Sequence, residues 1–152
     1  MLKNYYVLIS WALSIIVAQG VKPFIVKYRT GKPLNMKEAL NSGGFPSSHT
    51  SGVTALTLSV LFKEGASSSA FAIALAFSVV VMFDAANVRL QAGKNNKRVT
   101  DLLSELVSQG IVDAENFDTN LKEVLGHTWS EVFSGLVLGI IISVVLKLIL
   151  KV

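Results

Sequence analysis

The chain has 152 residues, 51% of them hydrophobic and only 16% charged, and its mean hydropathy is +0.55. Because a soluble domain usually carries about 25% charged residues, this composition predicts a small integral membrane protein with a single domain over residues 1–152. The net charge of +4 favours anionic lipid or an anionic substrate over nucleic acid as a partner, and the lack of cysteine excludes disulfides and thiolate sites.

We expect an all-α fold, a membrane bundle of about four transmembrane helices, because ~20 mostly apolar residues suffice to cross a bilayer. The first apolar segment, about 4–21, lies between Lys3 and Lys22 and lacks a small-residue cleavage site, so we interpret it as a retained helix. The other helices are expected at about 47–62, 66–89 and 129–150, and the first of these three is short for crossing alone.

A fifth, amphipathic helix is predicted at about 98–112, within the connection before the last transmembrane segment. Its apolar residues fall at helical spacing, with acidic and hydroxyl residues between them. They are Val99, Leu102, Leu103, Leu106 and Val107. We expect this helix to lie on the bilayer surface or to cap the bundle.

Four crossings place both long connections on one face of the membrane. That face carries ten of the 14 basic residues, so the positive-inside rule predicts that it is cytoplasmic in a multi-pass plasma or inner membrane protein. The ten are Lys22, Lys27, Arg29, Lys32, Lys37, Arg89, Lys94, Lys97, Arg98 and Lys122.

The same face holds both histidines of the chain, each near the start of a predicted helix. Helix starts expose unpaired N–H groups that favour a bound anion. Gly44, Ser47 and Ser48 next to His49 offer further backbone and hydroxyl groups. The helix starts at His49 and His127 could therefore share one phosphate-sized ligand.

Two spacings add to this constellation. His127 and Glu131 are four residues apart, so the carboxylate can accept a proton from one ring nitrogen and leave the other as a nucleophile or base. Lys22 and Arg29 are seven apart, on one side of two helical turns, where they can bind phosphate. These residues, with His49 as an acid, predict a phosphoryl-transfer site.

This pattern resembles the three-motif signature of the type 2 phosphatidic acid phosphatase superfamily. That signature has Lys and Arg seven apart, a Pro-Ser-Gly-His element, and Ser-Arg, five residues, His, three residues and Asp. The stretches GGFPSSHTS, DAANVRLQAG and LKEVLGHTWSEVFSG look like its divergent branch, described as acid phosphatase/vanadium-dependent haloperoxidase-related, and the resemblance covers Lys22 to Gly139.

The resemblance implies that His127 forms a phosphohistidine, that Glu131 orients it in place of the usual Asp, and that His49 protonates the leaving alcohol. The phosphate ligands that it implies are Lys22, Arg29 and Ser47. The chain departs from the signature at four places: Thr30 replaces Pro, Ser48 replaces Gly, and Asn120 and Leu121 replace Ser-Arg. The missing arginine has to be supplied by Lys122 or Arg89.

Asp84 and Arg89 lie in the last part of the helix predicted at 66–89, on the same side as the histidines. Asp84 is predicted as a carboxylate behind the phosphate ligands or as a ligand of a divalent cation near the phosphate, and Arg89 as a phosphate ligand. No other cofactor is expected. The alternative is a charge pair at an interfacial helix end.

Other residues also have a simpler interpretation. Lys22 and Arg29 both fit basic residues that mark the end of a membrane helix. Gly135 and Gly139 permit close helix packing, expected within one bundle, with a contact between two copies in a homo-oligomer as the alternative.

The sequence therefore predicts a phosphoric monoester hydrolase that acts on a lipid phosphate or pyrophosphate. The alternative is a non-catalytic membrane protein that binds anionic lipid or scaffolds a partner. A third hypothesis, a divalent metal on His49, His127, Glu131 and Asp84, lacks tight ligand spacing beyond one pair.

Overall fold

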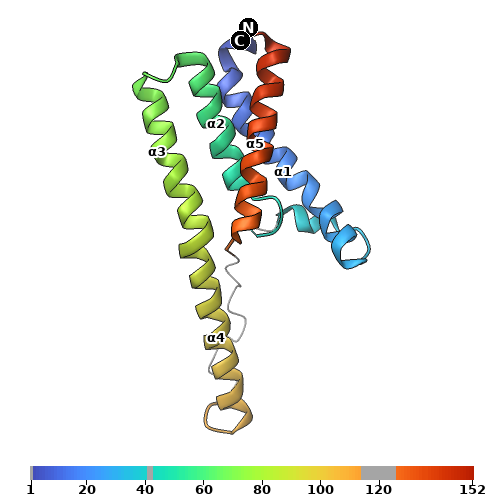
Figure 1. The fold of residues 1–152 in the computed structure, drawn as a ribbon. Coiled ribbons are helices and arrows are strands. Elements are labelled where there is room, and N and C mark those ends of the chain that lie inside the picture. The colour runs from blue at the N-terminus through green and yellow to red at the C-terminus, as the bar shows by residue number, and fades with distance from the viewer. Residues whose placement is uncertain (1, 41–42, 114–125) are drawn as a thin grey trace.

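The protein is described from a computed structural model that covers residues 2–40, 43–113 and 126–152, and the regular elements within these ranges are all helices (Figure 1). The α-helices are α1 (Tyr6–Thr30), α2 (Ser48–Glu64), α3 (Ser69–Phe83), α4 (Arg89–Ser108) and α5 (Trp129–Leu150). Two 3-10 helices, Leu2–Tyr5 and Met36–Leu40, and a π-helical turn, Asp84–Val88, complete them. The all-α prediction is confirmed.

Among the described residues, three helical segments are long and apolar enough to cross a membrane: α1, the continuous stretch Ser69–Ser108, and α5. The second predicted span, α2, has 17 residues and is instead the central helix of the bundle, with ten of them buried. Both chain ends lie at one end of the bundle, and the starts of α2 and α5 lie at the other (Figure 1).

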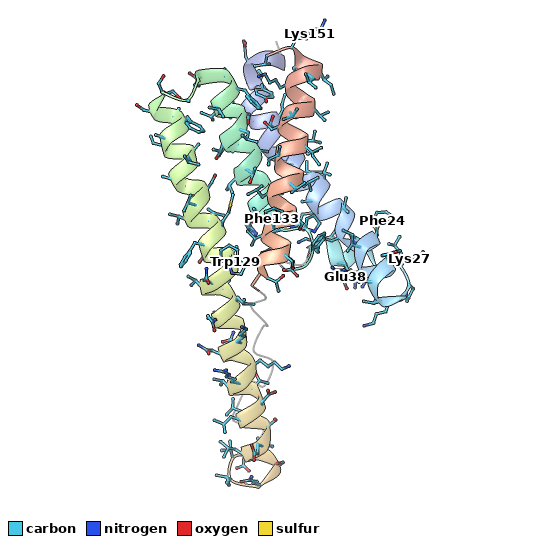
Figure 2. The ribbon with its side chains drawn as sticks, viewed as in Figure 1. Phe24, Lys27, Glu38, Trp129, Phe133 and Lys151 are labelled. Carbon is cyan, nitrogen blue, oxygen red and sulfur yellow. The ribbon has the colours of Figure 1, made fainter. Side chains whose placement is uncertain are left out.

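Exposed aromatic side chains surround the end of the bundle where α2 and α5 begin. Phe24, Trp129 and Phe133 lie near this end, whereas Lys151 lies at the opposite one (Figure 2). Aromatic residues are enriched where a membrane meets water, so this arrangement is typical of a bundle end near the bilayer surface.

The contact between α2 and α5 depends on two glycines. A Cβ atom on Gly135 would lie 2.4 Å from the Ser47 carbonyl oxygen, and one on Gly139 would lie 2.5 Å from the Ser51 carbonyl oxygen. Any larger residue would therefore push the two helices apart. The expected intramolecular role of Gly135 and Gly139 is thus what the structure contains.

Hydroxyl groups join the helices elsewhere in the bundle. The Ser14 and Ser51 hydroxyl oxygens are 2.6 Å apart between α1 and α2. The Tyr6 hydroxyl donates to the Ser143 carbonyl oxygen at 2.9 Å, which ties α1 to α5. In a membrane, such bonds and close packing hold helices together, because apolar side chains gain little by leaving lipid.

Helix α1 is longer than the predicted 4–21 and continues to Thr30. Pro23 does not end it, and the helix stops at Gly31, whose φ of 68° is the left-handed conformation that glycine adopts easily. Lys22 and Arg29 therefore both lie on α1, which agrees with the two helical turns that their spacing predicted.

The helix predicted at 98–112 is present, but it is not separate and its bounds differ. The chain continues from α3 through the π-turn (Asp84–Val88) into α4, which ends at Ser108 and projects from the bundle (Figure 1). None of the α4 residues is buried. Because no proline interrupts residues 84–108, the helix persists and its apolar stripe follows the direction of α3.

We predict that Gly139→Ala destabilises the protein by roughly 1–3 kcal/mol, because the added methyl group overpacks the contact between α2 and α5. Gly20→Ala is the matched control: a Cβ there meets no atom within 4 Å, and alanine in a helix is more stable than glycine by roughly 0.5–1 kcal/mol. Thermal denaturation of both variants in one detergent measures the difference. Equal midpoints would contradict the role given to this contact.

Candidate active site

The starts of α2 and α5 meet at one point and bring both histidines together. The Ser47 backbone N–H, at the start of α2, donates to the Glu131 carbonyl oxygen in the first turn of α5 at 3.1 Å. The His49 and His127 rings are 6.3 Å apart between centroids and meet edge to face. The predicted convergence of the two histidines is therefore present.

His127 is buried and its ring orientation is set by Glu131. The His127 Nδ1 atom lies 3.0 Å from Glu131 Oε2, and because a carboxylate only accepts, Nδ1 carries the proton. The other ring nitrogen, Nε2, is buried and has no hydrogen-bond partner among the residues that the structure describes. This leaves a lone pair on Nε2, and a buried polar atom without a partner is a mark of a ligand site.

Glu131 has a second role that sequence reasoning missed. Its Oε2 atom also accepts the backbone N–H of Thr128 at 3.1 Å, where Thr128 is the N-cap of α5. The signal was available, because Thr128-Trp129-Ser130-Glu131 matches the capping-box pattern of Ser or Thr followed three residues later by Glu. Helix capping thus fixes the carboxylate that holds His127.

The backbone around His127 is attached to the π-turn. The His127 N–H donates to the Ala85 carbonyl oxygen at 2.9 Å. A Cβ on Gly126 would lie 2.1 Å from the Leu90 nitrogen and 2.5 Å from the Arg89 carbonyl carbon, so only glycine fits there. These contacts fix His127 against the junction of α3 and α4, which the sequence did not reveal.

Lys22 is 2% exposed and lies close enough to Glu131 for their charges to interact. A lysine that only marks the end of a membrane helix would reach the surface, so burial argues against that interpretation. Arg29 is exposed, its Cζ atom lies 5.0 Å from the centroid of the Phe45 ring, and its charge also acts on Glu131. Both predicted cations therefore lie near the carboxylate that holds His127.

The residues before α2 have structural roles. Ser47 and Ser48 are buried, and the Ser47 hydroxyl oxygen, as N-cap, accepts the Thr50 backbone N–H at 3.4 Å and the Thr50 hydroxyl at 3.1 Å. The Ser47 N–H is bound to Glu131. Gly44 is exposed, with a φ of 90°. Phosphate binding by Gly44, Ser47 and Ser48 stays a prediction.

Asp84 and Arg89 form an ion pair in the π-turn, with 2.7 Å between Arg89 Nε and Asp84 Oδ2. They line a pocket of about 220 Å³ together with His49, Val80, Val81 and Ala85. The charge pair is thus present, and it borders a cavity that contains one of the two histidines.

The environment of His49 disfavours its charged form. Partial removal of water lowers the pKa of His49, and the positive charges of Arg89 and Lys22 lower it further. A phosphate bound beside the ring would act in the opposite direction and favour the protonated imidazole that a general acid requires.

Two predicted features of the site, the role of Lys122 and a bound cation, remain predictions. Lys122 lies outside the described residues. Among the residues in the described ranges, no group of three His, Cys, Asp or Glu side chains lies close enough to hold a metal ion. The third hypothesis, a metal on His49, His127, Glu131 and Asp84, has no such ligand set, and a cation bound near Asp84 stays an untested prediction.

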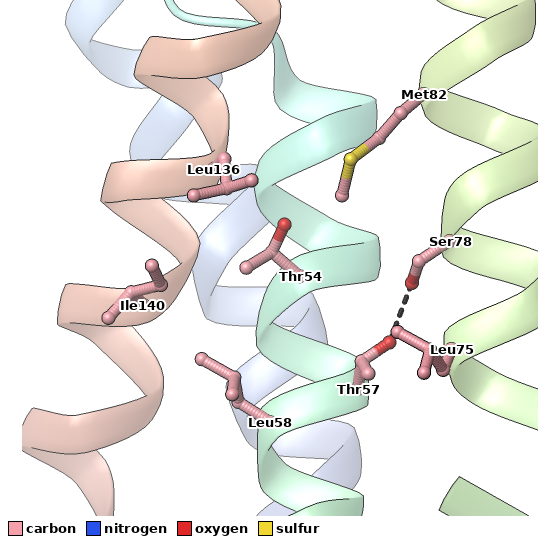
Figure 3. A pocket seen from close by; sticks show the side chains of 8 residues that line it. All are labelled: Thr54, Thr57, Leu58, Leu75, Ser78, Met82, Leu136 and Ile140. Carbon is pink, nitrogen blue, oxygen red and sulfur yellow. Dashed lines mark hydrogen bonds between the residues drawn. The ribbon is translucent and has the colours of Figure 1, made fainter. Parts of the chain in front are cut away.

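A second pocket, of about 230 Å³, lies between α2, α3 and α5 (Figure 3). The Thr57 and Ser78 hydroxyl oxygens are 2.6 Å apart, whereas the buried Thr54 hydroxyl has no hydrogen-bond partner among the described residues. The pocket begins five residues beyond His49 on α2 and five beyond Glu131 on α5, so it lies roughly 8–14 Å further into the bundle than the histidines. The residues that line it are Thr54, Thr57, Leu58, Leu75, Ser78, Met82, Leu136 and Ile140.

Comparison with known proteins identifies the family. Residues 2–142 match the family described as the Divergent PAP2 family, and the chain belongs to it. The chain is 35% identical over 143 residues to "Uncharacterized membrane protein YuiD" of Bacillus subtilis (strain 168), with 89% of each chain covered. No solved structure matches. The resemblance stated from the motifs is confirmed, and the comparisons support a membrane protein of a phosphatase-related family.

We predict that His127 carries its proton on Nδ1 in the ligand-free protein, because only that nitrogen faces the Glu131 carboxylate. The chain has two histidines, so a ¹⁵N-histidine spectrum contains only four ring nitrogens, and His49→Asn assigns them. Glu131→Ala should convert His127 to a mixture of tautomers, because the carboxylate that fixes the proton on Nδ1 is lost. A wild-type His127 with its proton on Nε2 would disprove the assignment.

Proposed function

We propose that this protein is a membrane phosphatase that hydrolyses a phosphate monoester or pyrophosphate of a lipid through a phosphohistidine intermediate. The observation that carries the proposal is the buried His127, whose Nδ1 contacts Glu131 while its Nε2 has no partner among the described residues. His49 beside it and the buried Lys22 supply an acid and a cation.

The proposed reaction has two steps. The Nε2 lone pair of His127 attacks phosphorus, the bond from phosphorus to the lipid oxygen breaks, and His49 gives that oxygen a proton. Water then attacks the phosphohistidine, His49 takes a proton from the water, and inorganic phosphate leaves. Glu131 stabilises the positive charge that His127 acquires, and Lys22 with Arg29 offsets the charge of the phosphate oxygens.

Phosphate needs room next to Nε2, and the structure indicates where that room can arise. His127 and Lys22 are held in the bundle, whereas the side chains of His49 and Arg29 are exposed. We expect the exposed His49 side chain to rotate away from His127 when phosphate enters. Burial then increases the strength of each charge interaction, because the site has a lower effective dielectric constant than water.

A lipid is the substrate class that the surroundings support. The apolar pocket of α2, α3 and α5 lies further into the bundle than the histidines, where an aliphatic chain attached to a phosphate at the site would extend. The concentration of basic residues at this end of the bundle supports a site on the cytoplasmic face.

The proposal predicts that His127→Ala abolishes phosphate release from every member of a panel of lipid phosphates, because the nucleophile is lost. Wild type and variant are compared after purification in the same detergent, with inhibition by vanadate as a second measurement. Retention of wild-type turnover by His127→Ala would refute the mechanism. Binding of lipid phosphate by wild type without any turnover would support the non-catalytic alternative instead. The same assay on sealed vesicles with a membrane-impermeant substrate reports which face carries the site.

The acid role of His49 leads to a separate expectation. General acid catalysis contributes roughly 10²–10⁴-fold, so His49→Asn should slow hydrolysis of an alkyl phosphate by about that factor. An aryl phosphate with a nitrophenolate leaving group needs no proton at its leaving oxygen. The rate at which the variant hydrolyses this substrate should therefore fall much less. Equal losses for both substrates would assign His49 a different role.

The apolar pocket leads to a prediction on chain length. Ile140→Trp should fill the pocket and raise KM for a long-chain lipid phosphate by about tenfold or more, with little change for a water-soluble short-chain phosphate, because burial of each methylene contributes ~0.8 kcal/mol. Ile141→Trp is the matched control, since both side chains are exposed on the same helix but Ile141 does not line the pocket. Equal effects of both variants on the long-chain substrate would show that the pocket does not hold the chain.

A further inference from the structure

A charged residue directly after the π-turn has no role in the reaction proposed above. Arg89 follows the π-turn, lines the 220 Å³ pocket beside His49, and exposes about half of its side chain. Its positive charge contributes to the lowered pKa of His49. Arg89 is therefore a cation next to the proposed acid, and it comes from the α3–α4 junction.

The ion pair with Asp84 leaves the outer edge of Arg89 available. Asp84 Oδ2 contacts the Nε atom at 2.7 Å. The two terminal Nη groups have no hydrogen-bond partner among the described residues. An arginine held through Nε presents its paired Nη donors as a planar fork, the geometry that suits two oxygens of one phosphate.

The position of Arg89 is fixed relative to His127 through the backbone. Ala85 in the π-turn accepts the His127 N–H, and the Gly126 backbone lies against the backbone of Arg89 and Leu90. A π-turn places a wider loop of backbone in a helix and is frequent at functional sites. Here the π-turn and the residues after it contact the backbone of Gly126 and His127, and this connects the proposed nucleophile to Arg89.

We infer that Arg89 binds the phosphate of the substrate through its Nη groups, and that Asp84 is a positioning residue that orients Arg89 through Nε. This inference rests on the proposed function. It assigns to Arg89 the charge that the family signature places at the position of Leu121. Lys22 from α1 and Arg89 from the α3–α4 junction would then approach one phosphate from separate helices.

Inorganic phosphate and vanadate are the probes that test this inference. We expect Arg89→Gln to raise the inhibition constants of both by roughly 10- to 100-fold, the range for loss of hydrogen bonds to a charged group. Arg89→Lys should recover part of this loss, because it keeps the charge but not the fork. Lys94→Gln and Arg98→Gln, exposed cations further along α4, are controls with expected changes under about twofold.

The role of Asp84 is tested by a double-mutant cycle. Asp84→Asn should weaken inhibition by phosphate in the wild-type background and have little further effect in Arg89→Gln, because it acts through Arg89. Thermal midpoints of all variants show whether the fold is retained. Additive effects of the two substitutions, or an Arg89→Gln variant with unchanged inhibition constants, would overturn the inference.

The outcomes also separate this inference from the proposed function. If wild type turns over lipid phosphate and His127→Ala does not, an unaffected Arg89→Gln variant refutes only the role of Arg89. If wild type shows no turnover, calorimetric titration with inorganic phosphate still tests Arg89: weaker binding by Arg89→Gln supports the inference, and unchanged binding overturns it.

Discussion

The close contact between α2 and α5 is the constraint on which the candidate site depends. With glycine at positions 135 and 139, the two backbones approach until a single added carbon would overlap a carbonyl oxygen of α2. At this separation the Ser47 N–H reaches the Glu131 carbonyl oxygen, so the two helix starts lie at one level. Each start carries a histidine, and the 6.3 Å between the rings follows from helix packing. Wider spacing would keep both histidines but separate them.

A second close contact connects the site to α3 and α4. Gly126 allows the chain before α5 to lie on the backbone at Leu90, and the π-turn offers the Ala85 carbonyl oxygen to the His127 N–H. His127 is thus held at its ring by Glu131 and at its backbone by Ala85. This double attachment fits a residue whose ring must keep one orientation while charge develops on it, since preorganised groups need no rearrangement during reaction.

The sequence predicted interactions that lie within one helical turn, and it failed where the three-dimensional path of the chain decides. The spacing of His127 and Glu131 predicted their contact, since the reach of residues four apart is short and local. The burial of Lys22 depends on how α1 packs against the bundle, which spacing does not encode. The apolar stripe from Val99 to Val107 correctly predicted a helix. It did not predict the direction of that helix, because α4 continues α3. The attachment of His127 to Ala85 joins residues 42 positions apart, and no local pattern signals it.

The replacement of the signature arginine by Leu121 illustrates what a phosphate site requires of its cations. A cation stabilises the transferring phosphoryl group when it is held at a fixed place relative to the nucleophile, and its position along the chain is immaterial. An arginine six residues before the histidine meets this condition through the intervening loop. We propose that Arg89 meets it by another route, because the π-turn that precedes it is bonded to the backbone of His127. Asp84, five residues earlier, contacts the guanidinium at Nε and leaves the two Nη groups without a hydrogen-bond partner among the described residues. On this argument a divergent sequence can relocate a cation between helices, provided that the new position is anchored to the same histidine.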